Sequence, residues 1–292
     1  MKLSILYFGH VGAVVDLLGE ADRLGFTRFW LGEHHTGGQC TNPLLLGALL
    51  AATSQGIRVG SGGVCLDYQS PLRVAEDACL IEFLLSGRFD LGVTRGLPLE
   101  PTFRDAMLHG RPPGTLRPYD ERLTELHGLL TRRLPPEHPL AGYKTLESGP
   151  PLWVLGGSVE TARWAGRHGT GFCLSLHHTP DFGGVAILDE YRRHFVPSPE
   201  FEAPEAIVVA SVACAPTREE ALEILRAHGL NGSTVAGSAA ECHAELANLA
   251  DRYGVEEMML LFLLPVRGTE LTDTYQALAQ LAGVMPHEPL DG

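Results

Sequence analysis

Short apolar runs alternate with amphipathic stretches along this chain of 292 residues, and this alternation is the feature that most limits its fold. Eight of the apolar runs are predicted to be strands, and the stretches between them carry apolar residues at helical spacing. The expected strands are Lys2–Phe8, Arg28–Gly32, Ile57–Val64, Phe89–Thr94, Leu152–Leu155, Gly171–Ser175, Ala206–Ala213 and Glu257–Leu264. Strands that alternate with helices form parallel sheets. A doubly wound sheet would need fewer strands or a second domain, so we expect an α/β fold, a single (β/α)8 TIM barrel over residues 1–292.

Cap signals mark several of the expected helices. Asn42 before Pro43 is typical of a helix start, and Ser238 with Glu241 three residues later forms a capping box. The expected helices lie near residues 14–24, 43–54, 71–85, 119–130, 160–168, 182–195, from 217, from 238 and from 271. Segment Gly96–Pro118 is rich in proline and glycine, so we expect a long loop there, over one end of the barrel.

Charge and cysteine usage exclude several classes of protein. The formal net charge of −13 disfavours nucleic acid and anionic membranes as partners. No apolar stretch reaches transmembrane length. The six cysteines are scattered without a CxxC motif, which fits free thiols in a reducing cytoplasm better than a disulfide framework or a zinc site. We therefore expect a cytoplasmic protein without a bound metal.

The second expected strand ends in Leu31-Gly32-Glu33-His34-His35, and active sites of such barrels lie at the C-terminal ends of the strands. Adjacent residues of an extended chain point to opposite sides, so His34 and His35 cannot readily chelate one metal ion. One imidazole can serve as a general acid or base, or contact a cofactor. The alternative is a pair of loop histidines whose nitrogens bond to the backbone.

Three further strand ends are polar or rich in glycine. Gly62–Gly63 suits a close approach of backbone to a flat ligand or a simple turn, and Cys65 breaks the G-x-G-x-x-G dinucleotide pattern. Arg95 follows a buried strand and suits a phosphate clamp or a surface ion pair. Ser158 and Thr161 suit a phosphate cradle at a helix start, or Ser158 is a simple N-cap. The common location of these segments favours a cofactor pocket.

Six motifs, spread over nearly the whole chain, are specific as a set. They are LGF and FWLGEHH within residues 24–35, PLRVAED at 71–77, GRFDLGVTRG at 87–96, VLGGS at 154–158 and VAGS at 235–238. Together they resemble the bacterial luciferase-like family of flavin-dependent monooxygenases. The resemblance implies a (β/α)8 barrel, usually a homodimer, that uses reduced FMN and O2.

The same resemblance implies roles for individual residues. His34 matches the family's catalytic histidine, which assists formation or breakdown of a flavin C4a-hydroperoxide, whereas His35 is expected to be structural. The pair Gly62–Gly63 matches the site of a non-prolyl cis peptide beneath the isoalloxazine ring. The residues implied to bind the flavin or its phosphate are Gly62, Gly63, Thr94, Arg95, Arg117, Gly157, Ser158 and Thr161.

Three departures from the family pattern bear on the reaction. Thr94 stands where luciferase has a cysteine beside the flavin, and Gly157 stands where an acidic residue is usual. Segment Arg226–Val235 is short where luciferase has a long lid between its seventh and eighth strands. A short lid shields a reactive flavin less well, unless the Gly96–Pro118 loop covers it. We therefore do not expect the aldehyde light reaction.

The expected function is an FMNH2- and O2-dependent monooxygenase that inserts one oxygen atom into a small organic substrate. A separate flavin reductase would supply the reduced FMN, because no nicotinamide-binding segment is evident. Two alternatives stay open: hydride transfer with the deazaflavin F420, and a flavin-binding protein without catalytic activity.

Overall fold

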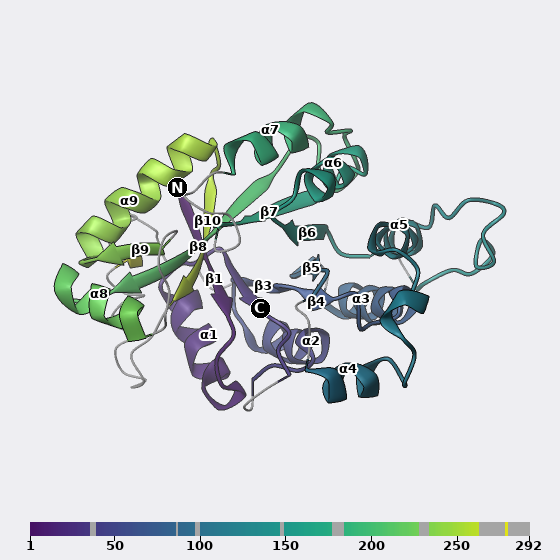
Figure 1. Ribbon diagram of the computed structural model, residues 1–292, viewed down its shortest axis with the longest axis horizontal. Helices are drawn as coiled ribbons and strands as arrows, with labels where there is room; N and C mark the ends of the chain where they lie inside the picture. The colour runs from purple at the N-terminus through teal and green to yellow at the C-terminus, as the bar shows by residue number, and fades with distance from the viewer. Residues whose placement is uncertain are drawn as a thin grey trace.

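A closed barrel of parallel strands, ringed by helices, forms the centre of the computed structural model (Figure 1). The structure describes residues 1–35, 39–85, 87–96, 100–146, 149–176, 184–227, 234–262 and 278–279. The strands are β1 (Lys2–Tyr7), β2 (Arg28–Leu31), β3 (Arg58–Ser61), β4 (Val64–Cys65), β5 (Phe89–Thr94), β6 (Leu152–Gly156), β7 (Gly171–Ser175), β8 (Ala206–Cys214), β9 (Thr234–Gly237) and β10 (Glu257–Phe262). The helices are α1 (Val14–Arg23), α2 (Pro43–Thr53), α3 (Pro71–Leu85), α4 (Pro101–Met107), α5 (Tyr119–Leu130), α6 (Val159–Arg167), α7 (Val185–Arg193), α8 (Arg218–Ala227) and α9 (Ala239–Tyr253), with 3-10 turns η1 (Val11–Ala13) and η2 (Pro113–Thr115).

Strand order closes the sheet on itself. The order is β10-β1-β2-β3-β5-β6-β7-β8, and β10 pairs in turn with β8. Every one of these pairings is parallel. The expectation of a (β/α)8 TIM barrel is therefore confirmed, and all the strand C-termini lie on one rim.

Local cap signals formed as the sequence indicates. The Asn42 side chain accepts a hydrogen bond of 3.0 Å from the backbone N–H of Leu45 at the start of α2. At α9 the Ser238 hydroxyl accepts from the N–H of Glu241, whose carboxylate accepts in return from the Ser238 N–H. These caps fix where helices begin relative to the strands before them.

Two expectations about the chain course were wrong. The Gly96–Pro118 segment is not a loop throughout, because it contains α4 and η2. Glu100 caps α4 by accepting from the N–H of Thr102 at 3.0 Å, and Pro101 occupies the first turn, so a short helix forms despite the surrounding prolines. The second omission is β9, which pairs with Ser211–Cys214 at the end of β8. The expected helix from residue 271 lies outside the described residues, except for 278–279.

Aromatic and aliphatic side chains fill the barrel interior. This inner cluster consists of Leu6, Trp30, Trp153, Cys173, Phe201, Ile207, Val209 and Met259. The Trp30 and Trp153 rings meet edge-on at 6.0 Å between centroids, and the Phe201 ring lies 5.3 Å from that of Trp153. A larger apolar layer lies between the strands and the surrounding helices. The interior is therefore packed, so a ligand site must form above it, at the rim.

A cluster of paired charges closes the opposite, N-terminal end of the barrel. This floor cluster consists of Arg28, Arg58, Asp90 and Glu257, each in the first two residues of its strand. Both arginines bond to Asp90, Arg28 at 3.1 Å and Arg58 at 2.8 Å, and Arg28 also pairs with Glu257. Two positive and two negative side chains meet there, so the cluster is electrically balanced.

Candidate functional site

Four neighbouring strand ends carry the residues that the sequence singled out. Strands β2, β3, β5 and β6 follow one another around the barrel. His34 comes after β2, Gly62–Gly63 joins β3 to β4, Arg95 follows β5 and Ser158 follows β6. Because the strands are parallel, all four segments lie on the same C-terminal rim.

Glu33 ties the first two of these segments together. Its carboxylate is buried and accepts a 2.8 Å hydrogen bond from the backbone N–H of Cys65. The same carboxylate lies 2.8 Å from Nε2 of His35 and 3.4 Å from the amide nitrogen of Gln69. A buried carboxylate needs such partners, so Glu33 locks the end of β2 onto the start of β4. The His35 imidazole is therefore occupied by its contact with Glu33.

His34 points elsewhere, as expected for adjacent residues of an extended chain. Its backbone N–H donates to the carbonyl oxygen of Cys40 at 2.8 Å, which fixes the position of the residue. Its half-buried ring lies edge-on to Phe8, with 6.2 Å between the centroids. Among the described residues no side chain or carbonyl bonds to the His34 imidazole, so its nitrogens can serve a ligand.

Gly62 and Gly63 stand where the barrel leaves no room for a side chain. A Cβ on Gly62 would lie 2.7 Å from Cδ1 of Leu6, and a Cβ on Gly63 would lie 2.9 Å from the carbonyl oxygen of Gly92. The peptide bond between the two glycines is cis, which confirms the geometry that the family resemblance implies. Its position beneath a flavin stays a prediction.

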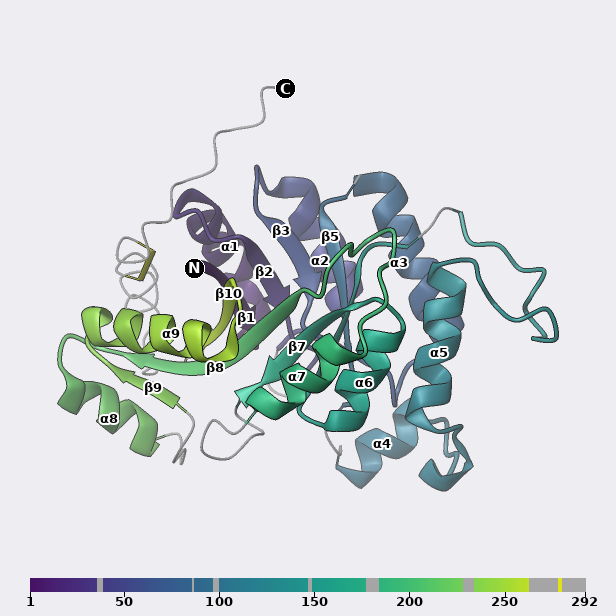
Figure 2. The same ribbon diagram turned by 90° about the horizontal axis from the view of Figure 1, so that it is seen from above.

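Arg95 and Arg117, which the sequence analysis assigned to a phosphate group, line one pocket of about 240 Å³. This arginine pocket is bounded by Asp67, Tyr68, Arg95, Arg104, Leu108, Leu116, Arg117, Pro118, Tyr119 and Arg122. Its walls come from the ends of β4 and β5, from α4 and from the start of α5. In Figure 2, α4 lies at one end of α5, while segment 131–146 projects away from the barrel at the other.

Two of the four arginines are already engaged. Arg122 is buried and donates to the carbonyl oxygens of Leu66 and Arg117 and to the carboxylate of Asp67. Arg117 is more exposed and pairs with the Glu125 carboxylate on the next helix turns. These contacts hold the start of α5 against the end of β4, so they build the wall of the pocket.

The other two arginines and a tyrosine keep unused donors. The Arg95 guanidinium lies 4.9 Å from the ring centroid of Tyr119, and no carboxylate pairs with it in the described part of the chain. Arg104 has one weak ion pair, to Asp105 at 3.4 Å, and its Nε is buried without a hydrogen-bond partner. The buried Tyr119 hydroxyl also has no partner.

These unused donors define the chemistry of the ligand. Burial raises the pKa of the Tyr119 phenol, so the hydroxyl keeps its proton and can donate. Two guanidinium groups beside such a hydroxyl match a phosphate or a similar anion, which accepts several charge-assisted hydrogen bonds. An orphaned buried donor costs free energy until an acceptor arrives. The pocket therefore fits an anionic group.

Thr94 is the last residue of β5, and its neighbour across the sheet is Cys65. The carbonyl oxygen of Thr94 accepts a hydrogen bond from the N–H of Leu66 at 2.9 Å, and the residue is half-buried at the C-terminal end of β5. Burial raises the pKa of the Cys65 thiol to about 12, so this sulfur stays protonated. The rim thus carries a hydroxyl on β5 beside an inert thiol on β4.

Ser158 and Thr161 lie outside the arginine pocket. The Ser158 hydroxyl accepts from the N–H of Thr161 at 3.2 Å and lies 3.1 Å from the Thr161 hydroxyl. Ser158 is therefore an N-cap of α6, and both it and Gly157 are exposed on the same rim. Phosphate binding by Gly157, Ser158 and Thr161 stays a prediction.

Four residues of the site were not predicted from the sequence. Glu33 stands inside the motif that drew attention to His34, so its acidic side chain on a buried strand end was an available signal. Arg104, Tyr119 and Arg122 gave no comparable signal, because only folding brings α4 and α5 over the end of β5.

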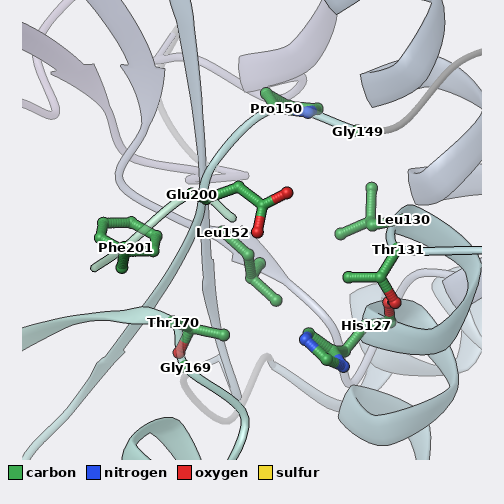
Figure 3. Close-up of a pocket in the computed structure, with 10 residues that line it drawn as sticks. All are labelled: His127, Leu130, Thr131, Gly149, Pro150, Leu152, Gly169, Thr170, Glu200 and Phe201. Atoms are coloured by element: carbon green, nitrogen blue, oxygen red, sulfur yellow. The ribbon is translucent and has the colours of Figure 1, made fainter. Parts of the chain in front are cut away.

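A second pocket lies at the other end of the barrel (Figure 3). It is lined by His127, Leu130, Thr131, Gly149, Pro150, Leu152, Gly169, Thr170, Glu200 and Phe201. Its volume of about 20 Å³ is suited to a single water molecule. Burial lowers the pKa of His127 there to about 4, so the imidazole is neutral at physiological pH. This pocket is too small for a substrate.

Within the described ranges, no group of three or more His, Cys, Asp or Glu side chains is placed to hold a metal ion. None of the helices in the same ranges combines the length and hydropathy needed to cross a membrane.

Sequence comparison matches residues 6–262 to the family model described as luciferase-like monooxygenase. The uncharacterized protein YceB of Bacillus subtilis is 38% identical over 215 residues, which cover 72% of this chain and 64% of that protein. The N-acetyl-S-alkylcysteine monooxygenase of the same organism is 31% identical over 254 residues, 82% of this chain and 75% of that protein. The chain thus spans less than two thirds of the length of YceB.

Solved structures share the fold over nearly the whole chain. Apo-MsnO8 has a TM-score of 0.83 at 28% identity, covering 98% of this chain and 99% of that one. The oxygenating constituent of 3,6-diketocamphane monooxygenase from Pseudomonas putida, in complex with FMN, has a TM-score of 0.72 at 15% identity and covers 99% of both chains. An F420-dependent secondary alcohol dehydrogenase also has a TM-score of 0.72, at 14% identity, covering 98% of this chain and 99% of that one. The last two similarities establish the barrel alone.

Proposed function

The chain belongs to the luciferase-like monooxygenase family, and we propose that it is a flavin-dependent monooxygenase that uses reduced FMN and O2 to insert one oxygen atom into a small organic substrate. The observation that carries this proposal is the arginine pocket, where Arg95, Arg104 and Tyr119 present unused donors at the barrel rim. FMN ends in a phosphate monoester, an anion for which such donors are suited.

We assign the phosphate of FMN to the unused donors of Arg95, Arg104 and Tyr119. Arg117, which also pairs with Glu125, would add charge, and the hydroxyls of Ser158 and Thr161 would be further donors from the neighbouring strand end. The backbone at Gly62, Gly63 and Gly157 and the side chain of Thr94 would contact the rest of the cofactor. Glycine at position 62 or 63 leaves the backbone itself as the contact surface, because no side chain fits there.

His34 is the residue to which we assign proton transfer. When bound and reduced, FMN supplies the electrons that activate O2. The chain supplies an imidazole at the rim whose nitrogens make no other bond within the described residues. The backbone bond to Cys40 and the Glu33 lock hold the strand end that carries His34, so the ring is presented from a fixed position.

A reductase and a second copy of the chain complete the proposal. The reduced FMN would come from a separate flavin reductase in the cytoplasm. For the second copy, α2 and α3 pack together and expose a patch of large apolar side chains, namely Leu45, Leu49, Leu80, Phe83 and Leu84. Exposed apolar side chains of this kind can pack against the same side chains of a second copy across a twofold axis, so they fit a homodimer. Light scattering of the purified protein and of Leu49→Glu tests this interface.

F420-dependent hydride transfer is the second candidate, because the barrel with FMN and the barrel with F420 are equally similar to this one. Titration of the flavin-free protein with FMN, riboflavin and F420 separates the candidates. We expect FMN to bind at least tenfold more tightly than riboflavin, which lacks the phosphate. Preferential binding of F420 would overturn the assignment of FMN.

The role of His34 is tested with His34→Ala. General acid–base groups contribute roughly 10²- to 10⁴-fold in rate, so we expect a loss of turnover of about that size with FMN affinity unchanged within about threefold. Turnover is measured as incorporation of ¹⁸O from ¹⁸O2 into product, with FMN and a flavin reductase, over a panel of thioethers and terpenes. Wild-type turnover by the variant would refute the assignment, and lack of turnover of any compound by the wild-type protein would favour a non-catalytic flavin-binding protein.

A further inference from the structure

Two cysteines meet where β8 and α9 approach each other on the rim side of the barrel. Cys214 is the last residue of β8, and Cys242 lies near the start of α9. Both are free thiols; Cys242 is fully buried, whereas Cys214 is partly exposed. The side chain of each thiol shifts the pKa of the other.

Regular structure holds this pair in place. Strand β9 pairs Cys214 with Gly237, and the Ser238 capping box starts α9 directly afterwards. The Cys242 sulfur lies 3.5 Å from the carbonyl oxygen of Gly237 and 3.8 Å from that of Ala213. Because these carbonyls belong to the cross-strand partner and the chain neighbour of Cys214, the two sulfurs are brought together by the backbone itself.

The other four cysteines lack this environment. Burial raises the pKa of Cys40 to about 11 and that of Cys65 to about 12, and it also raises the pKa values of Cys79 and Cys173. By contrast, interaction with the Cys242 side chain lowers the pKa of Cys214. The same interaction, together with burial, raises the pKa of Cys242. Cys214 is thus a solvent-accessible thiol with a stabilised thiolate, the kind that peroxide attacks first.

We propose that Cys214 and Cys242 form a modification site, a dithiol that hydrogen peroxide converts to an intramolecular disulfide. The Cys214 thiolate attacks one peroxide oxygen, the O–O bond breaks, and the departing hydroxide takes up a proton to leave as water. The Cys242 sulfur then gives up its proton and attacks the sulfenic sulfur of Cys214, and a second water leaves. Two thiols and one H2O2 thus give one disulfide and two waters, with sulfur oxidised and peroxide reduced.

The source of the oxidant, but not the site, rests on the proposed function. Reduced flavin that passes two electrons to O2 without oxygenating a substrate releases H2O2, so the peroxide would form at the same rim. The experiment below adds H2O2 to the flavin-free protein, so a failure of the proposed function leaves its result unaffected.

The test is a thiol count by mass spectrometry. The full-length protein is treated with a small excess of H2O2, quenched with catalase, denatured and alkylated with iodoacetamide. We expect four alkylated cysteines instead of the six of the untreated protein, a peptide pair joined through Cys214 and Cys242, and return to six after treatment with dithiothreitol. Six alkylated cysteines after peroxide, or a disulfide between other residues, would overturn the proposal.

Variants establish the order of attack. Cys242→Ser removes the resolving thiol, so Cys214 should accumulate as the sulfenic acid and be labelled by dimedone. Cys214→Ser should abolish the disulfide, whereas Cys79→Ala, a matched control on α3, should still form it. If Cys242→Ser does not fold, Cys242→Ala and the partly exposed Cys214→Ser carry the test. A disulfide that persists in Cys214→Ser contradicts the site, and dimedone labelling of Cys242 in place of Cys214 contradicts the mechanism.

Discussion

The floor cluster and the arginine pocket both contain arginines, at opposite ends of one barrel. The arginines of the floor cluster are paired with carboxylates, whereas the pocket contains an arginine that is not, among the described residues. At the floor, Arg28 and Arg58 are matched by Asp90 and Glu257, and each group sits on a strand of the barrel. At the rim, four arginines face three nearby carboxylates, those of Asp67, Asp105 and Glu125. One of these arginines, Arg95, has no carboxylate partner in the described part of the chain.

The contrast distinguishes an arginine that stabilises the fold from one that binds a ligand. A buried charge that is fully paired contributes to the integrity of the fold, and its removal exposes the cost of the partner left behind. A charge that keeps unused donors beside an orphaned hydroxyl is set up for a ligand from outside. Stability measurements should therefore respond at the floor, and binding measurements should respond at the rim.

The largest effect is expected for Asp90→Asn at the floor. Asp90 is buried and accepts from both Arg28 and Arg58, so its neutralisation leaves Arg58 without a charge partner among the described residues and Arg28 with Glu257 alone. Breaking a buried pair in this way costs about 3–5 kcal/mol. Urea denaturation, followed by the fluorescence of the three tryptophans, measures the loss. An unfolding free energy within about 0.5 kcal/mol of wild type would show that the floor cluster does not stabilise the barrel.

Arg95→Ala comes next, with the opposite profile. Hydrogen bonds to charged groups contribute about 1.5–3 kcal/mol, so the Kd for FMN should rise roughly ten- to hundredfold while the unfolding free energy stays within about 0.5 kcal/mol. Riboflavin, which has no phosphate, serves as the control ligand, and its affinity should not change. Equal loss of FMN and riboflavin affinity would place Arg95 against the ring instead of the phosphate.

Tyr119→Phe should give a smaller change with the same direction. The variant keeps the ring beneath Arg95 and removes the hydroxyl that has no partner in the protein. FMN binding should weaken about tenfold or less, because one hydrogen bond is lost. The free energy of unfolding should rise slightly or stay unchanged, because the orphaned group is gone. A clear loss of stability would mean that the hydroxyl is engaged in the ligand-free protein.

The smallest effect is expected from salt. Raising NaCl from 0.05 to 0.5 M should weaken FMN binding by a few-fold, because the rim is open to solvent and its charges are screened. The thermal midpoint of the ligand-free protein should change little over the same range of salt, because the floor cluster is largely buried. If salt lowers the midpoint and leaves FMN affinity constant, the roles assigned to the two regions are reversed.

Much of the barrel follows from periodicity and local signals. The eight apolar runs, the Asn42 and Ser238 caps and the parallel order of the strands together place His34, Gly62, Arg95 and Ser158 on one rim. This follows because in a parallel barrel the sequence position of a strand end fixes its neighbours. The cis peptide at Gly62–Gly63 came from the family resemblance and is present in the structure.

What the sequence did not reveal depends on contacts between distant segments. Strand β9 has four residues and no clear periodicity, and it forms because β8 extends past the barrel and offers it an edge. Arg104 and Tyr119 become pocket residues because α4 and the start of α5 fold over β5. The pairing of Cys214 with Cys242 likewise needs β9 and the α9 cap to form first. In each case a tertiary contact decides, and no local pattern encodes it.

The arginine pocket is formed by two parts of the chain, the barrel and the segment between β5 and α5. Arg95 belongs to the barrel, whereas Arg104 and Arg117 are carried by the excursion between β5 and α5. Insertions and substitutions in such a connecting segment do not change the pairing of the strands. Evolution, or an engineer, can therefore replace residues 100–118 as a cassette and change the anion that the site selects. The barrel would retain its core, its floor and His34 at the end of β2.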